Sequence, residues 1–181
     1  MSRPLPELTK ELDVLIDRPT LEKRLDELGE QLTRDYAGKP LVVLGVLKGS
    51  VMFMADLTRR IDLPLSMDFL GVSSYGDKTV SSGVVRITSD LSKPIEGKHV
   101  LIAEDIVDTG HTMKNVTEHI LRRQPKRMRT IALLDKPSRR EVDIKTDFLG
   151  FEIPDEFVVG YGIDFAQRNR NLPFIGKVRF T

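Results

Sequence analysis

The stretch His99-Val-Leu-Ile-Ala-Glu-Asp-Ile-Val-Asp-Thr-Gly-His-Thr112 decides the fold of this chain. Residues 99–103 are mostly apolar, and a short continuous run of this kind is typical of a strand buried on both faces of a parallel sheet. Three carboxylates then follow within five residues, at Glu104, Asp105 and Asp108. Because buried carboxylates without partners are costly, we expect them at the carboxyl end of the strand, where open α/β sheets bind their ligands.

The turn that follows the acids has the composition of a phosphate site. Residues 108–112 supply a glycine for a tight turn, two hydroxyls and the backbone N–H groups of a helix start, which together bind phosphate. The neighbouring carboxylates suit a hydrated Mg²⁺ and the hydroxyls of a sugar. For an isolated turn the better interpretation is a solvated helix cap, with Asp108 or Thr109 as the capping residue. The strand, acids and Thr-Gly-x-Thr turn occur here in order, which favours the phosphate site.

Strand and helix patterns alternate on both sides of this stretch. Apolar positions from Leu21 to Tyr36 recur at three- and four-residue steps, which predicts an amphipathic helix over 19–36 with Thr20 as its cap. The alternation predicts an open, mostly parallel α/β sheet flanked by helices. We expect one domain over 1–181, with a core of about 41–150 and a small hood built from the N-terminal segment and about 151–181. The remaining expected elements are helices over 50–60 and 112–123 and strands over 41–46, 65–73, 84–87, 99–103, 129–134 and 157–161.

The composition excludes several classes of protein. The 181 residues are 40% hydrophobic and carry a formal net charge of +1, so neither a polycation nor a disordered tail fits. There is no cysteine, which rules out disulfides and a thiolate nucleophile. No apolar run approaches the ~20 residues needed to cross a bilayer, and the first residues lack the apolar stretch of a signal peptide. We therefore expect a cytoplasmic protein with no membrane partner.

The segment Glu104–Thr112 resembles the phosphoribosyl-pyrophosphate-binding signature of the type I phosphoribosyltransferases. The resemblance is closer to the 6-oxopurine branch, the hypoxanthine/guanine phosphoribosyltransferases, and covers about residues 41–172. Four further segments carry it: Leu47-Lys-Gly-Ser50 looks like the pyrophosphate loop, Ser73-Ser-Tyr-Gly76 like the start of the lid, Lys136 like a purine-contacting lysine, and 148–164 like the purine-binding segment. The resemblance also implies a type I phosphoribosyltransferase fold and a peptide bond between residues 47 and 48 that is often cis.

The reaction that the resemblance implies belongs to purine salvage. The 5-phosphoribosyl group of phosphoribosyl pyrophosphate is transferred, with Mg²⁺, to hypoxanthine and/or guanine, giving the nucleoside 5′-monophosphate and pyrophosphate. Asp108 would be the catalytic base for the purine N7 proton. The implied binding residues are Glu104, Asp105, Asp108, Thr109, Gly110, His111, Thr112, Lys48, Gly49 and Arg170 for phosphoribosyl pyrophosphate; Lys136, Phe157, Val158 and Asp164 for the purine; Glu104, Asp105 and Asp164 for the metal; and Ser74 and Tyr75 for the lid.

Alternatives remain open at several of these positions. Taken alone, Lys136 is an ordinary solvent-facing lysine at a strand end, Phe157 a core aromatic and Arg170 a solvated arginine. Relatives often carry another residue where this chain has His111, which puts a side-chain contact to phosphate there in doubt. The resemblance implies a homo-oligomer, a dimer or a tetramer. The sequence does not decide which 6-oxopurine is preferred.

A regulator that uses this fold to bind a nucleotide and nucleic acid is the main competing hypothesis. From Arg122 to Arg140 the chain has eight Lys/Arg and one acid, Asp135, and such a basic face can hold a phosphodiester backbone. More often a run of this kind is a solvated helix end and loop, so nucleic acid is not the partner we expect. A third possibility, a nucleotide-binding module without chemistry, leaves Tyr75 and Asp164 without a role.

Overall fold

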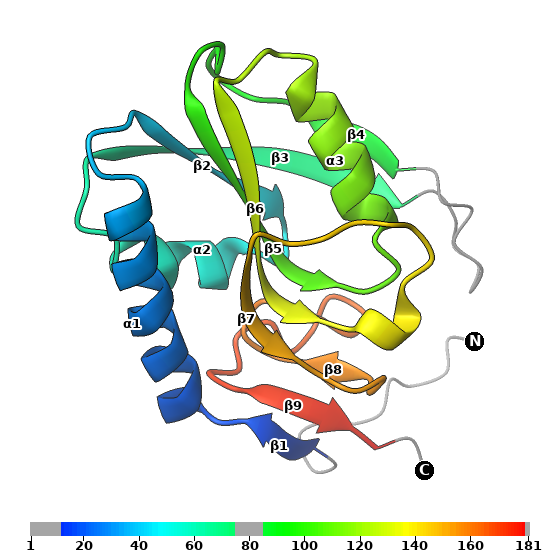
Figure 1. Cartoon of the computed structure of the whole chain (residues 1–181). Helices are drawn as coiled ribbons and strands as arrows, with labels where there is room; N and C mark the ends of the chain where they lie inside the picture. The colour runs from blue at the N-terminus through cyan, green and yellow to red at the C-terminus, as the bar shows by residue number, and fades with distance from the viewer. Residues whose placement is uncertain (1–11, 75–84, 180–181) are drawn as a thin grey trace.

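The computed structural model describes residues 12–74 and 85–179, and its main feature is a six-stranded sheet in the order β4-β3-β2-β5-β6-β7 (Figure 1). Neighbouring strands pair parallel except β3 and β4, which pair antiparallel. The predicted open, mostly parallel α/β sheet is confirmed. Its strands are β2 (Leu41–Leu47), β3 (Leu65–Ser74), β4 (Val85–Ser89), β5 (His99–Val107), β6 (Arg127–Asp135) and β7 (Phe148–Glu152).

Helices cover both faces of this sheet, as Figure 1 shows. α1 (Arg18–Asp35) and α2 (Val51–Thr58) lie on one face, and α3 (His111–Leu121) lies on the other. A hydrophobic core lies on each face of the sheet, and alternate residues of β2 belong to one or the other. Leu41 and Val43 pack with α1 and α2, while Val42, Leu44 and Val46 pack with α3. Because side chains alternate across a strand, a strand buried on both faces must be apolar at every position, as predicted for β2.

The N-terminal helix confirms the amphipathic pattern but not its predicted cap. Leu21, Leu25, Leu28, Leu32 and Tyr36 are all buried. The helix begins at Arg18, and the Asp17 carboxylate accepts the Thr20 backbone N–H at 2.9 Å. Thr20 was therefore the wrong cap. Proline suits the first turn of a helix, where its missing N–H costs nothing, so the capping residue lies before Pro19 rather than after it.

Two strand predictions were wrong. β5 continues to Val107, so Glu104 and Asp105 lie within the strand and not beyond its end. The pattern ended the strand early because acids are unexpected in a buried strand; here they face a cavity. The predicted buried strand over 157–161 contains only β8 (Val158–Val159), which belongs to a separate sheet, and the last strand of the large sheet is β7.

A second, three-stranded antiparallel sheet has the order β1-β9-β8 and lies beyond the ends of β6 and β7 in Figure 1. It joins β1 (Leu12–Ile16) and β9 (Ile175–Val178), which come from opposite ends of the described chain, to β8. We call residues 12–16 and 157–178 the hood. α1 packs most extensively against α2 and β7, and its buried leucines share one hydrophobic cluster with the hood residues Tyr161 and Ile175. The division into a core of about 41–150 and a hood stays a prediction.

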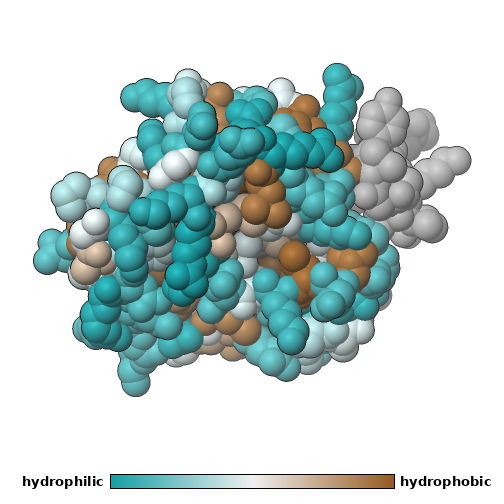
Figure 2. Space-filling view, turned by 45° about the horizontal axis from the view of Figure 1, so that its top comes forward, coloured by the Kyte–Doolittle hydropathy of each residue, from teal (hydrophilic) through white to brown (hydrophobic). Residues whose placement is uncertain are grey.

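The visible surface in Figure 2 is mostly hydrophilic, with hydrophobic residues in small separate groups. The exposed large hydrophobic residues of the described ranges come from different elements: Val14, Met52, Met67, Leu121 and Phe157. None of the helices in the described part of the chain combines the length and apolar character needed to span a membrane.

Candidate active site

A cavity of about 600 Å³ lies where β2 and β5 end, between the large sheet and the hood. It gathers residues that are far apart in the sequence: the loop after β2, the end of β5 with the turn that follows, and part of the hood. Most of the predicted site residues line it, namely Lys48, Gly49, Glu104, Asp105, Asp108, Thr109, Gly110, Thr112, Asp164 and Arg170.

Glu104 and Asp105 form a buried carboxylate pair on the cavity wall, with 6% and 9% of their surface exposed. Burial, and next the charge of Asp105, raise the pKa of Glu104 well above its ordinary value. Burial also raises the pKa of Asp105. The Glu104 Oε2 atom has no hydrogen-bond partner among the described residues. Such a pair is costly in the protein alone, and a cation or sugar hydroxyls in the cavity would stabilise its charged form.

The turn after β5 places the start of α3 at the cavity. Gly110 adopts φ +92°, the left-handed region, and α3 begins at the next residue. Gly110, Thr112 and Met113 line the cavity. The first N–H groups of a helix have no partner within it and attract anions. His111 is directed elsewhere, since its Nε2 lies 2.9 Å from Glu141 Oε2 and it does not line the cavity.

The loop after β2 is packed closely between β5 and the hood. The peptide bond between Leu47 and Lys48 is cis, which answers a question that the sequence left open. A Cβ atom at Gly49 would overlap the Asp105 carboxylate, and one at Gly162 would overlap the Gly49 carbonyl oxygen. Glycine is therefore required at both positions because other backbone or carboxylate atoms occupy the space of a side chain.

Arg170, Asp164 and Gln167 form a polar group on the hood side of the cavity. Arg170 Nη2 pairs with Asp164 Oδ1 at 2.7 Å, and Arg170 is therefore not the solvated arginine of the alternative interpretation. Gln167 Oε1 accepts from Lys48 Nζ and from Arg170 Nη2, both at 3.3 Å. The sequence analysis missed Gln167. No periodic pattern marks it, and its position between Asp164 and Arg170 was the only available signal.

Asp108 pairs with an arginine that the sequence analysis did not single out for this site. Arg139 Nε donates to Asp108 Oδ1 at 3.2 Å and also lies 3.7 Å from Asp155 Oδ1. The Asp108 backbone oxygen accepts from Arg140 Nη1 at 2.6 Å. The only sequence signal for this contact was that both arginines closely follow Lys136, a predicted site residue. They reach Asp108 because β6 ends beside the end of β5.

Of the four predicted purine residues, Asp164 lines this cavity and the other three do not. Lys136 is 6% exposed, so it is not a solvent-facing lysine, and its backbone N–H donates to the Val107 oxygen at 3.0 Å. Phe157 is 41% exposed, so it is not a core residue, and it meets Phe165 edge to face at 5.4 Å. Val158 is buried in β8. The structure thus gathers around the cavity the predicted phosphoribosyl-pyrophosphate residues except His111, but not these three purine residues.

The predicted metal residues do not form one cluster. Among the described residues no group of three or more His, Cys, Asp and Glu side chains is arranged to hold a metal ion. Glu104 and Asp105 nevertheless fit Mg²⁺, because one carboxylate oxygen lacks a partner and Mg²⁺ is usually held by one or two carboxylates together with substrate oxygens and water. Ser74 is the last residue of β3, and Tyr75 lies outside the described residues.

Comparison with known proteins defines the class to which this fold and cavity belong. Residues 12–166 match the family described as "Phosphoribosyl transferase domain". The hypoxanthine phosphoribosyltransferase of Haemophilus influenzae is 54% identical over 170 residues, which cover 92% of this chain and 95% of that protein. The hypoxanthine-guanine phosphoribosyltransferase of Bacillus subtilis is 51% identical over 166 residues and 92% of each chain.

A solved structure agrees with this class. The crystal structure of a hypoxanthine phosphoribosyltransferase from Staphylococcus aureus superposes with a TM-score of 0.91 at 49% identity, covering 98% of this chain and 97% of that one. The chain belongs to the hypoxanthine-guanine phosphoribosyltransferases, as the resemblance of its motifs predicted.

Proposed function

We propose that the cavity at the ends of β2 and β5 is the active site of this enzyme and that the residues around it have the roles described below. The chain is a pentosyltransferase of purine salvage: it transfers the 5-phosphoribosyl group of phosphoribosyl pyrophosphate to hypoxanthine or guanine. The observation that carries the assignment of the site is the meeting, in one cavity, of a helix N-terminus, two buried carboxylates and the Lys48 loop.

The proposed reaction forms one bond and breaks another at C1′ of the ribose. The purine N9 lone pair forms the new bond to C1′ while the bond from C1′ to the pyrophosphate oxygen breaks. Asp108 takes the N7 proton, a role that suits a carboxylate at the cavity wall. Arg139 Nε lies 3.2 Å from Asp108 Oδ1, so a purine that meets this carboxylate has to share or replace that contact.

Binding of phosphoribosyl pyrophosphate is divided among three parts of the cavity. The backbone N–H groups at the start of α3, with Thr109 and Thr112, hold the 5′-phosphate. Glu104 and Asp105 would hold the ribose hydroxyls and Mg²⁺, and the ion would supply positive charge that stabilises the pyrophosphate leaving group. Lys48 and Arg170 neutralise the remaining phosphate charge on the hood side.

Purine recognition is assigned to residues beside the cavity. Lys136 would donate to the purine O6 oxygen, Phe157 would stack on the base and Val158 would contribute backbone groups. Lys136 lies next to Asp108 because β5 and β6 end together, and Phe157 is exposed enough to meet a planar ligand. Asp164 is assigned to the water shell of a second Mg²⁺, and residues 74–75 to a lid.

The regulator hypothesis receives less support from the structure. The basic run from Arg122 to Arg140 is divided by the length of β6, so its members lie at opposite ends of a nine-residue strand. Four of its arginines are in ion pairs, with Asp90, Asp35, Asp108 and Asp135 as the acids. The run therefore does not form a single basic face for a nucleic acid. Cytoplasmic location and assembly into a dimer or tetramer stay predictions.

The test is a stoichiometric assay of the purified chain. Phosphoribosyl pyrophosphate is mixed with hypoxanthine, guanine or xanthine, with Mg²⁺ or with EDTA, and pyrophosphate and nucleotide are both measured. We expect equal amounts of the two products with hypoxanthine or guanine, only when Mg²⁺ is present. A mixture without base measures simple hydrolysis. No product with any of the three bases would refute the proposed function.

A further inference from the structure

The hood turn 160–163 is held in place by its own backbone. Gly160, Tyr161 and Gly162 all have positive φ angles, of 104°, 48° and 100°. The Tyr161 N–H donates to the Leu172 oxygen and the Gly162 N–H to the Arg170 oxygen, both at 2.9 Å. These two hydrogen bonds therefore tie the turn to the segment that carries Arg170.

This turn lies against the loop that precedes α2. The Gly162 backbone is packed against the Gly49 carbonyl, with no room for a Cβ atom between them. Arg170 Nη1 donates to the Gly162 oxygen at 2.7 Å. The turn thus contacts two groups assigned to the pyrophosphate end of the substrate: Gly49 of the Lys48 loop and the Arg170 side chain.

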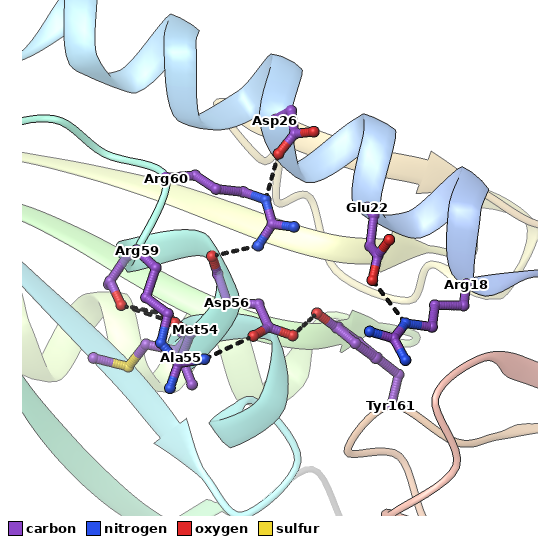
Figure 3. A network of polar contacts seen from close by, with 10 residues as sticks. Arg18, Glu22, Asp26, Met54, Ala55, Asp56, Arg59, Arg60 and Tyr161 are labelled. Carbon is purple, nitrogen blue, oxygen red and sulfur yellow. Dashed lines mark hydrogen bonds and ion pairs between the residues drawn. The ribbon is translucent and has the colours of Figure 1, made fainter.

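The Tyr161 side chain reaches out of the hood to α2. Figure 3 shows its hydroxyl directed at Asp56, and the hydroxyl donates to Asp56 Oδ2 at 2.6 Å. Burial, and next this hydrogen bond, raise the pKa of Tyr161 far above its ordinary value, so the hydroxyl keeps its proton. α2 begins at Val51, directly after the loop, so the body that carries Asp56 is continuous with Lys48 and Gly49.

Asp56 itself is anchored to the helical layer. Its Oδ1 accepts from Arg59 Nη1 at 3.2 Å, and its backbone oxygen accepts from Arg60 Nη1 at 2.9 Å. Arg60 also pairs with Asp26 of α1 at 2.6 Å (Figure 3). The acceptor is thus held by contacts that lead to both helices of this face, so the bond ties the 160–163 turn, with the Arg170 segment bonded to it, to this layer.

We propose that Tyr161 and Asp56 form a positioning pair that sets the spacing between the Lys48 loop and Arg170, and so the affinity for the pyrophosphate group. This rests on the proposed function of the same cavity. Neither residue lines the cavity. The purine contacts depend on the pair less, because Lys136 follows β6 in the large sheet and Val158, although it lies in the hood, is held by its pairing with β9 and not by the 160–163 turn.

Tyr161→Phe tests the pair while keeping the ring. Since a hydrogen bond to a charged group contributes more than a neutral one, we expect KM for phosphoribosyl pyrophosphate to rise about tenfold. The KM for pyrophosphate in the reverse reaction should rise similarly, and the KM for hypoxanthine by less than about twofold. Tyr36→Phe is the matched control: it removes a buried hydroxyl that has no hydrogen-bond partner among the described residues, and both KM values should stay unchanged.

Variants of the acceptor complete the test. Asp56→Ala should raise the KM for phosphoribosyl pyrophosphate, and combining it with Tyr161→Phe should add little, because both remove the same bond. Asp56→Asn keeps an acceptor and should restore most of the affinity. The proposal is overturned if Tyr161→Phe leaves both KM values unchanged, raises them equally, or adds fully to Asp56→Ala. An inactive unmodified enzyme would instead refute the proposed function.

Discussion

Gly162→Ala tests whether the contact between the hood and the Lys48 loop controls activity. A Cβ atom at Gly162 would lie at least about 1 Å closer to the Gly49 oxygen than real Cβ atoms lie to their neighbours. Because the neighbour is backbone, the hood or the loop must move by a similar distance. A misplacement of about 1 Å at a reacting group can cost about 100-fold, so we expect kcat/KM for phosphoribosyl pyrophosphate to fall by about that factor.

The substitution also has a backbone cost, which a second glycine measures separately. Gly97 has φ +68°, and no heavy atom lies within 4 Å of the place where its Cβ would be. A Cβ in the left-handed region costs about 1–2 kcal/mol, so Gly97→Ala should lower Tm by roughly 2–8 °C. Its kcat/KM should stay at the unmodified value, because the loop after β2 is not displaced.

Steady-state kinetics with varied phosphoribosyl pyrophosphate and a thermal melt of each variant separate the two effects. Gly162→Ala should lose activity even well below its Tm, where Gly97→Ala is fully active. If the two variants lose the same activity, or if Gly162→Ala retains the kcat/KM of the unmodified enzyme, the close contact with Gly49 does not control the site and the reasoning fails.

Three further predictions concern the cavity and the purine contact. Asp108→Asn should lower kcat by about 10²–10⁴ while phosphoribosyl pyrophosphate binds nearly as before; an unchanged kcat would exclude Asp108 as the base. Lys136→Met should reduce kcat/KM for the purine far more than the binding of phosphoribosyl pyrophosphate, and equal effects in titrations of both substrates would contradict its role. Glu104→Gln should raise Tm of the protein without ligands and weaken binding of phosphoribosyl pyrophosphate with Mg²⁺, as calorimetry would show. Because the folded-state pKa of Glu104 is raised, its contribution to stability falls as pH rises above the ordinary value of 4.5, so the Tm advantage of the variant should grow with pH; a constant difference would be evidence against the shift.

Much of the large sheet and of the segment that lines the cavity at the end of β5 could be predicted, because both are encoded locally. β2 is apolar at every position from Leu41 to Leu47, and α1 repeats its buried leucines with the helical period. The acids and turn of 104–112 are consecutive in sequence, and all but His111 line the cavity. Where the prediction was wrong, as at the end of β5 and over 157–161, polar residues at a cavity and turn residues with positive φ interrupted the pattern.

The sequence by itself determined the alternation of strands and helices, the glycine turn before α3 and the family, since each is carried by residues that are neighbours along the chain. Only the tertiary structure decided how the hood meets the large sheet. Tyr161 and Asp56 are 105 residues apart, and Arg139 and Asp108 are 31 apart. No period or spacing encodes such pairs, because they depend on where whole elements pack. The close approach of Gly162 to Gly49 has the same origin. A glycine in the sequence does not name the group packed against it, and only the folded chain shows that this group is the Gly49 carbonyl oxygen.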